Sequence, residues 1–187
     1  MSQKSYKTNI VNLIGGPGSG KTLNATRLFY KLKLKGRLVE YVSEYAKKLV
    51  WLNDFDTLND QYLVSNKQFK LLKAMEHRVP YVVTDACLLH GLYYNKFHPD
   101  NVSNVEKTHK KILESYNTFN NINIFIVRGS YPYEQAGRYQ SESAAKEIDA
   151  HMEQILIDSG IKYMRFNPDV QNLKDVLEYI LSFEDKS

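Results

Sequence analysis

A glycine-rich segment near the start of the chain has residue types and spacing suited to binding phosphate. It follows the pattern G-x-x-x-x-G-K-[ST] and consists of Gly15, Gly16, Pro17, Gly18, Ser19, Gly20, Lys21 and Thr22. Glycines let backbone N–H groups come close to a phosphate because no Cβ intervenes. The lysine ammonium can reach the terminal phosphates of a nucleoside triphosphate, and the threonine hydroxyl can bind Mg²⁺. The motif therefore predicts a P-loop that binds ATP and Mg²⁺.

The segments on both sides of this loop match the structural context that the motif needs. Residues 10–14 are an apolar run that predicts a buried strand, and residues 21–35 carry apolar side chains near helical spacing. A helix that starts at the loop adds its unpaired N–H donors and the positive end of its dipole. The alternative, an ordinary glycine-rich turn between a strand and a helix, is disfavoured by the motif and its context together.

Two carboxylates follow other predicted strands. Asp85 comes directly after the β-branched run at 81–84, and Glu44 follows the predicted strand at 38–42. Ligands bind at the carboxyl ends of parallel strands. There, Asp85 can hold the magnesium water shell or accept a proton from an acceptor hydroxyl, and Glu44 can act as general base or hold a sugar hydroxyl. The alternatives are that Asp85 is a helix N-cap and that Glu44 is a first-turn glutamate behind an N-capping Ser43.

A polar, turn-rich segment at about 128–143 predicts a lid. Arg128 ends the fourth predicted strand, and Arg138 lies ten residues later beside Gly137. Phosphoryl transfer needs positive charge near the equatorial oxygens and the exclusion of water, and a guanidinium fork suits phosphate oxygens. Both arginines are therefore candidate catalytic residues, with solvated surface positions as the alternative.

Short apolar runs alternate with helical segments over the whole chain, which predicts a single α/β domain over residues 1–187 with a parallel sheet. Strands are expected at 10–14, 38–42, 81–84, 122–127 and 161–166, and helices at 21–35, 44–52, 58–77, 105–119, 144–159 and 173–183. Gly160 is expected to end the helix that precedes the last strand.

Composition narrows the function classes. A formal net charge of +4 allows a phosphate-handling site but does not by itself favour nucleic acid. The one cysteine, Cys87, excludes an internal disulfide framework and fits a reduced, cytoplasmic setting, and the five histidines show no metal-ligand spacing. The absence of an apolar run of about 20 residues disfavours a membrane span. The polar start of the chain lacks the apolar core of a signal peptide.

The order of these motifs resembles a family of P-loop, AAA-like ATP-binding proteins that is common in tailed-phage genomes. The residues that carry the resemblance are the P-loop at 15–22, Ser43-Glu44-Tyr45-Ala46-Lys47, Thr84-Asp85, and Arg128 with Gly137-Arg138. The family is similar to the nicotinamide riboside kinase domain and, more distantly, to deoxynucleoside and nucleoside-monophosphate kinases. The resemblance implies a three-layer sandwich around a five-stranded parallel sheet of order 2-3-1-4-5, with an arginine-bearing lid, and the use of ATP and Mg²⁺.

The resemblance also implies roles for individual positions. Glu44 and Tyr45 correspond to a Glu-Tyr pair on the acceptor side, and Thr84 and Asp85 to the Thr-Asp pair after the third strand. The riboside kinase domain carries a further aspartate where this chain has Val83. This departure weakens the expectation of nicotinamide riboside as the acceptor.

Together these features predict a kinase that transfers the γ-phosphate of ATP to a small nucleoside or nucleotide, in the cytoplasm (of the host, if a phage encodes it), as a monomer or homodimer. A second hypothesis is a kinase acting on a hydroxyl of a modified base in DNA. A third is a P-loop ATPase that acts as a switch or assembly factor, although such proteins usually carry extra modules for their partners.

Overall fold

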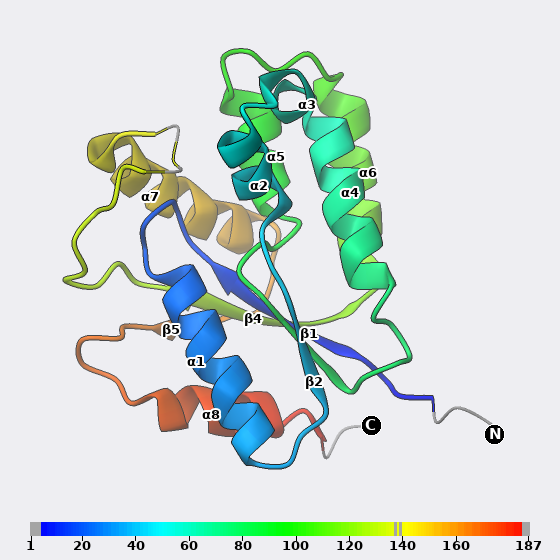
Figure 1. Cartoon of the computed structure of the whole chain (residues 1–187), viewed down its shortest axis with the longest axis vertical. Coiled ribbons are helices and arrows are strands. Elements are labelled where there is room, and N and C mark those ends of the chain that lie inside the picture. The colour runs from blue at the N-terminus through cyan, green and yellow to red at the C-terminus, as the bar shows by residue number, and fades with distance from the viewer. Residues whose placement is uncertain (1–4, 137, 139, 185–187) are drawn as a thin grey trace.

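A parallel five-stranded sheet forms the centre of the molecule in the computed structural model, which describes residues 5–136, 138 and 140–184. The strand order is β2-β3-β1-β4-β5, and every neighbouring pair is parallel, which confirms the expected fold (Figure 1). The strands are β1 (Asn9–Ile14), β2 (Val39–Val42), β3 (Tyr81–Thr84), β4 (Asn120–Ile126) and β5 (Met164–Phe166). The helices are α1 (Lys21–Leu34), α2 (Tyr45–Leu52), α3 (Phe55–Asn59), α4 (Gln61–Lys73), α5 (His90–Phe97), α6 (Val105–Asn117), α7 (Glu142–Asp158) and α8 (Leu173–Leu181).

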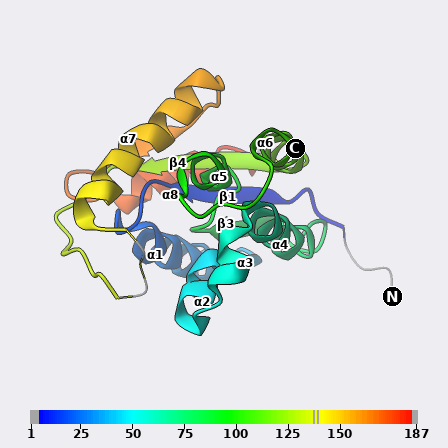
Figure 2. The same cartoon turned by 90° about the horizontal axis from the view of Figure 1, so that it is seen from above.

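Helices cover both faces of the sheet because its strands are apolar on both sides. Along β1, Ile10 and Ile14 pack with buried residues of α4, α6 and α7, whereas Val11 and Leu13 pack with α1 and α8. This is the period-two alternation of a strand buried on both faces. Figure 1 shows α1 and α8 below the sheet and the other large helices above it, and Figure 2 shows α5 between α7 and the α2–α3 pair.

Two predicted elements differ in the structure, and one further helix was not predicted. The helix expected over 58–77 is two helices, because the Asp60 carboxylate accepts a hydrogen bond from the Leu63 N–H at 3.1 Å and starts α4 afresh. The last strand is shorter than predicted, since β5 pairs only with the end of β4. Helix α5 was not predicted. Gly160, with φ 61°, follows α7 as expected.

No helix in the part of the chain that the structure describes has the length and apolar character needed to cross a bilayer.

Candidate active site

The P-loop joins β1 to α1 and adopts a conformation that needs its glycines. Gly18 and Gly20 have φ angles of 71° and 91°, in the left-handed region that L side chains rarely adopt. The Lys21 ammonium donates to the Gly16 carbonyl at 2.7 Å, which folds the side chain back over its own loop. The first residues of α1, at 21–23, line the cavity, so the start of this helix and the lysine ammonium lie at the same place, as a phosphate-binding loop requires.

Thr22 and Asp85 meet because β1 and β3 are neighbouring parallel strands. Asn12 pairs with Thr84, so the residues that follow both strands lie at the same edge of the sheet. The Thr22 hydroxyl donates to Asp85 Oδ2 at 2.5 Å. Asp85 Oδ1 is buried and has no hydrogen-bond partner among the described residues.

These two side chains fit the site expected for Mg²⁺. The ion prefers hard oxygen ligands and is usually bound by one or two protein groups, with substrate phosphates and waters completing its shell. A hydroxyl and an unpartnered carboxylate oxygen match that pattern. In the described part of the chain no cluster of three or more His, Cys, Asp or Glu side chains could hold a metal by itself. Thr22 and Asp85 would therefore hold Mg²⁺ only together with the bound nucleotide.

Glu44 points its carboxylate into the site instead of capping a helix. It is the N-cap residue of α2, yet its side chain makes no capping hydrogen bond. The exposed N–H of Tyr45 is satisfied by Gln68 of α4, whose Oε1 accepts at 3.0 Å while its Nε2 donates to the Ser43 carbonyl at 3.3 Å. Gln68 thus holds the backbone on both sides of Glu44 and leaves the carboxylate available for chemistry.

The charges of Lys21, Glu44 and Asp85 act on one another. Burial raises the pKa of Glu44, although the Lys21 ammonium opposes the shift. Burial also lowers the pKa of Lys21, against the attraction of Glu44 and Asp85. The Tyr41 phenol lies beside Asp85, and burial together with that carboxylate raises its pKa. Three groups predicted from separate motifs therefore form one electrostatic unit.

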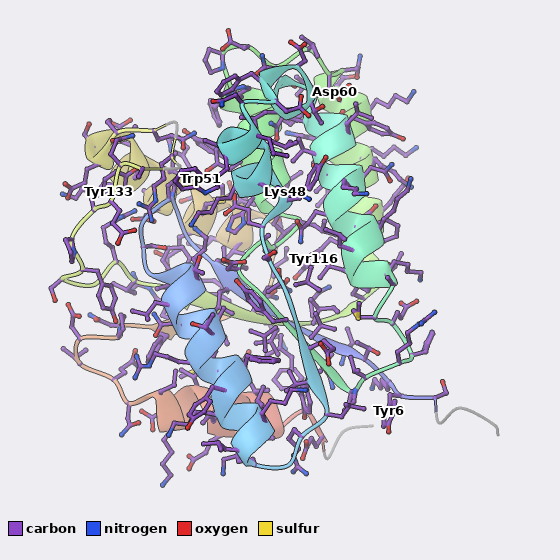
Figure 3. All side chains as sticks on the ribbon, in the orientation of Figure 1. Tyr6, Lys48, Trp51, Asp60, Tyr116 and Tyr133 are labelled. Atoms are coloured by element: carbon purple, nitrogen blue, oxygen red, sulfur yellow. The ribbon has the colours of Figure 1, made fainter. Side chains whose placement is uncertain are left out.

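Arg138 reaches the same cavity from the lid. Its guanidinium lies 5.2 Å from the centre of the Tyr133 ring and 4.0 Å from a carboxylate oxygen of Glu134. Nη1 is buried and has no hydrogen-bond partner among the described residues, so it can donate to a ligand. Gly137, which also belongs to the predicted lid, lies outside the described residues. Figure 3 shows Tyr133 on the loop before α7 and Trp51 on α2.

Arg128 holds the P-loop rather than projecting into the cavity. Its Nε donates to Asp149 Oδ2 at 2.7 Å, and its Nη2 donates to the carbonyls of Pro17 at 2.8 Å and Ala145 at 3.2 Å. Asp149 Oδ1 in turn accepts from the Gly16 N–H at 2.6 Å. A Cβ at Gly16 would lie 2.6 Å from the Ala145 carbonyl, so only glycine lets the loop come this close to α7.

His90 supports the loop from the other side. The Gly15 N–H donates to His90 Nε2 at 3.4 Å, and burial lowers the pKa of this imidazole well below its usual value, so it is neutral and can accept. Sequence reasoning missed His90, Gln68 and Asp149. They contact residues 75, 25 and 133 positions away, respectively, and no local pattern signals such contacts.

Asp149→Ala is expected to raise the KM for ATP about 10- to 100-fold, since charge-assisted hydrogen bonds contribute about 1.5–3 kcal/mol. The variant lacks the carboxylate that accepts hydrogen bonds from the Gly16 N–H and from Arg128, so the P-loop is no longer held against α7. Steady-state kinetics with ATP and acceptor varied separately will measure this, with Glu147→Ala, an exposed carboxylate on the same helix, as the matched control. Asp149→Asn keeps an acceptor for Gly16 and should restore part of the loss. An unchanged KM for ATP in Asp149→Ala would contradict the positioning role.

A cavity of about 500 Å³ connects these groups. This volume lies within the usual range for small-molecule sites. The cavity is lined by residues of the P-loop and the lid, and by residues of α2, α4 and the segment around α5. Of the predicted site residues, Gly15, Pro17, Gly18, Gly20, Lys21, Thr22, Glu44 and Arg138 line it directly. Asp85 borders it through Thr22.

The model of a family described as an AAA domain matches residues 10–172. The chain belongs to the AAA domain family. The match extends from β1 to the turn before α8, so this AAA domain includes the P-loop, both carboxylates and the lid. No curated protein matches the sequence.

Two solved structures share the fold of this AAA domain. A crystal structure of NadR protein in complex with NAD and AMP-PNP aligns with a TM-score of 0.69 and 12% identity, covering 95% of this chain and 49% of that one. The chain thus spans about half the length of that relative. A structure of deoxyadenosine kinase from M. mycoides, with products dCMP and a flexible dCDP bound, aligns with a TM-score of 0.58 and 15% identity, covering 95% of this chain and all of that one. This AAA domain therefore shares its fold with these two proteins.

Proposed function

We propose that this AAA domain is an ATP-dependent phosphotransferase that moves the γ-phosphate to a small nucleoside-like or nucleotide-like acceptor. The observation that carries the proposal is that the P-loop Lys21 lies beside Glu44 and Asp85, and that Lys21 and Glu44 line the same cavity of about 500 Å³. This cavity extends from the P-loop to residues of α2 and α4, which leaves room for an acceptor beside the phosphate site. A kinase needs that room, whereas an ATPase switch does not.

Each side chain has a distinct task in this reaction. The P-loop N–H groups and Lys21 bind the β- and γ-phosphates, and Arg138 donates to the phosphoryl oxygens from the lid. Glu44 takes the proton of an attacking hydroxyl as the oxygen–phosphorus bond forms and the bond to the β–γ bridging oxygen of ATP breaks, which leaves ADP. Mg²⁺, held by Thr22 and Asp85 together with the nucleotide, would neutralise charge on the phosphates. Arg128 and Asp149 hold the loop in shape.

An acceptor screen tests the proposal. The protein is incubated with Mg²⁺, ATP labelled in the γ-phosphate, and separate panels of nucleosides, deoxynucleotides, nicotinamide riboside and hydroxymethylated DNA. Transfer of label to a small acceptor is the expected result. Label on DNA alone would move the reaction to a modified base, and release of inorganic phosphate with no labelled acceptor would identify an ATPase and overturn the proposal.

A further inference from the structure

Two tyrosine rings of the lid pack directly against the P-loop. A Cβ placed on Gly18 would lie 2.6 Å from Cδ2 of Tyr133, and a Cβ placed on Gly20 would lie 3.0 Å from Cε2 of Tyr131. Each ring therefore occupies the space that a side chain on the loop would need. The lid lies against the loop at two of its glycines with positive φ, so the two segments are in contact without a ligand between them at these points.

The Tyr133 ring also contacts the lid arginine. The guanidinium carbon of Arg138 lies over this ring, 5.2 Å from its centre, which is within the cation–π range of about 6 Å. The ion pair of Arg138 with Glu134 holds the guanidinium less firmly, because the two charged groups are 4.0 Å apart and the Glu134 side chain is 80% exposed to water. The ring is therefore the contact that best defines where the guanidinium lies.

Hydrogen bonds fix the orientation of the Tyr133 ring. Its hydroxyl donates to the Gln140 carbonyl at 2.7 Å. Gln135 Nε2 donates to the same carbonyl at 3.0 Å and to the Arg138 carbonyl at 3.1 Å, so the turn that carries the arginine is tied to the end of the lid. Burial raises the pKa of the Tyr133 phenol, which keeps its proton available for this bond.

Tyr133 thus touches the P-loop with one edge of its ring and Arg138 with one face. Cδ2 and Cε2 form the edge that packs on Gly18. The face attracts the cation because the π-electrons of an aromatic ring give it a partial negative charge. Arg138 lines the cavity, and its Nη1 is buried without a hydrogen-bond partner among the described residues. The position of this donor relative to the P-loop therefore depends on the tyrosine between them.

From these contacts we propose that Tyr133 is a positioning residue, whose ring holds the Arg138 guanidinium beside the P-loop so that it can donate to the phosphoryl oxygens during transfer. The inference rests on the proposed function and adds to it the residue that couples the lid to the nucleotide site. Tyr133 itself makes or breaks no bond in the reaction. Its effect on the rate passes through Arg138 and is absent when Arg138 is absent.

A double-mutant cycle on kcat tests this dependence. Tyr133→Leu, Arg138→Ala and the double variant are compared with the wild type in the transfer of label from γ-labelled ATP. Tyr133→Leu is expected to lower kcat about 3- to 30-fold, the effect of losing one partly desolvated cation–π contact, and to change the KM for ATP less than about twofold. In the Arg138→Ala background the same substitution should change kcat less than about twofold. Tyr133→Phe keeps the ring and should retain kcat within about threefold of the wild type.

Tyr131→Leu is the matched control, because it removes the other ring that packs on the P-loop, at Gly20. Its effect on kcat, whatever its size, should be the same with and without Arg138. Circular dichroism of every variant should show the helix content of the wild type.

Three results would overturn the inference while the kinase assignment stands. These are an unchanged kcat in Tyr133→Leu, an equal loss of kcat from Tyr133→Leu with and without Arg138, and a Tyr133→Phe variant as slow as Tyr133→Leu. Release of inorganic phosphate by the wild type with no labelled acceptor would instead remove the proposed function. The same cycle measured on phosphate release would then decide the inference, with the same coupling between Tyr133 and Arg138 expected.

Discussion

Lys21→Ala is expected to lower kcat for phosphoryl transfer at least about 100-fold, comparable to the loss of one preorganised donor to a developing negative charge. The ammonium is the only cation that the P-loop itself contributes, and its bond to Gly16 holds it over the loop. Its removal leaves the terminal phosphates of ATP without their main counter-charge, while the sheet and α1 keep their packing. Transfer of label from γ-labelled ATP to the acceptor measures the loss.

The matched control is Lys31→Ala, which removes a lysine from an exposed position further along the same helix. It should leave kcat unchanged, and circular dichroism should show the same helix content and melting temperature in both variants. Phosphoryl transfer at the wild-type rate in Lys21→Ala would rule out the P-loop as the nucleotide site.

Glu44→Gln is expected to lower kcat/KM on its plateau near neutral pH about 10²–10⁴-fold, the usual contribution of a general base. It should also remove the acid limb of the pH–kcat/KM profile. Burial raises the pKa of Glu44, so its protonated, inactive form persists to higher pH than for an exposed glutamate. In the unmodified protein kcat/KM should therefore fall as pH falls through a midpoint above the ordinary glutamate value of about 4.3.

Profiles of kcat/KM from acid to neutral pH, in the wild type and in the variant, make this measurement. Glu40→Gln provides the control, because Glu40 lies on β2 before Glu44 but forms an ion pair with Lys33 at 3.6 Å on the surface. If kcat/KM of Glu44→Gln still fell at low pH as in the wild type, Glu44 would not be the general base, and Asp85 would be the remaining candidate.

Local patterns were enough to predict the glycine-rich loop between β1 and α1 and most of the elements around it. The P-loop is a contiguous motif, and its glycines, lysine and threonine act through backbone geometry set within eight residues. The strand at 81–84 has the predicted bounds, and α1 begins at Lys21 as predicted. Both agree because the spacing of apolar residues reflects which side chains are buried. The break between α3 and α4 at Asp60 was not predicted, because an aspartate within a helical pattern can be either an N-cap or an ordinary exposed helix residue.

What surrounds the P-loop depended on the tertiary structure. That Asp85 meets Thr22 follows from the pairing of β1 with β3, and that Glu44 faces Lys21 follows from Gln68, which holds the α2 backbone from α4. Arg128 is the clearest case. Its residue type and position predict a contact with phosphate, whereas in the folded molecule it donates hydrogen bonds to Asp149 and to the Pro17 carbonyl and so supports the P-loop. A sequence states which groups are available for chemistry. Which of them remain unpaired and face a ligand depends on contacts between residues far apart in the chain, and only the folded molecule determines those contacts.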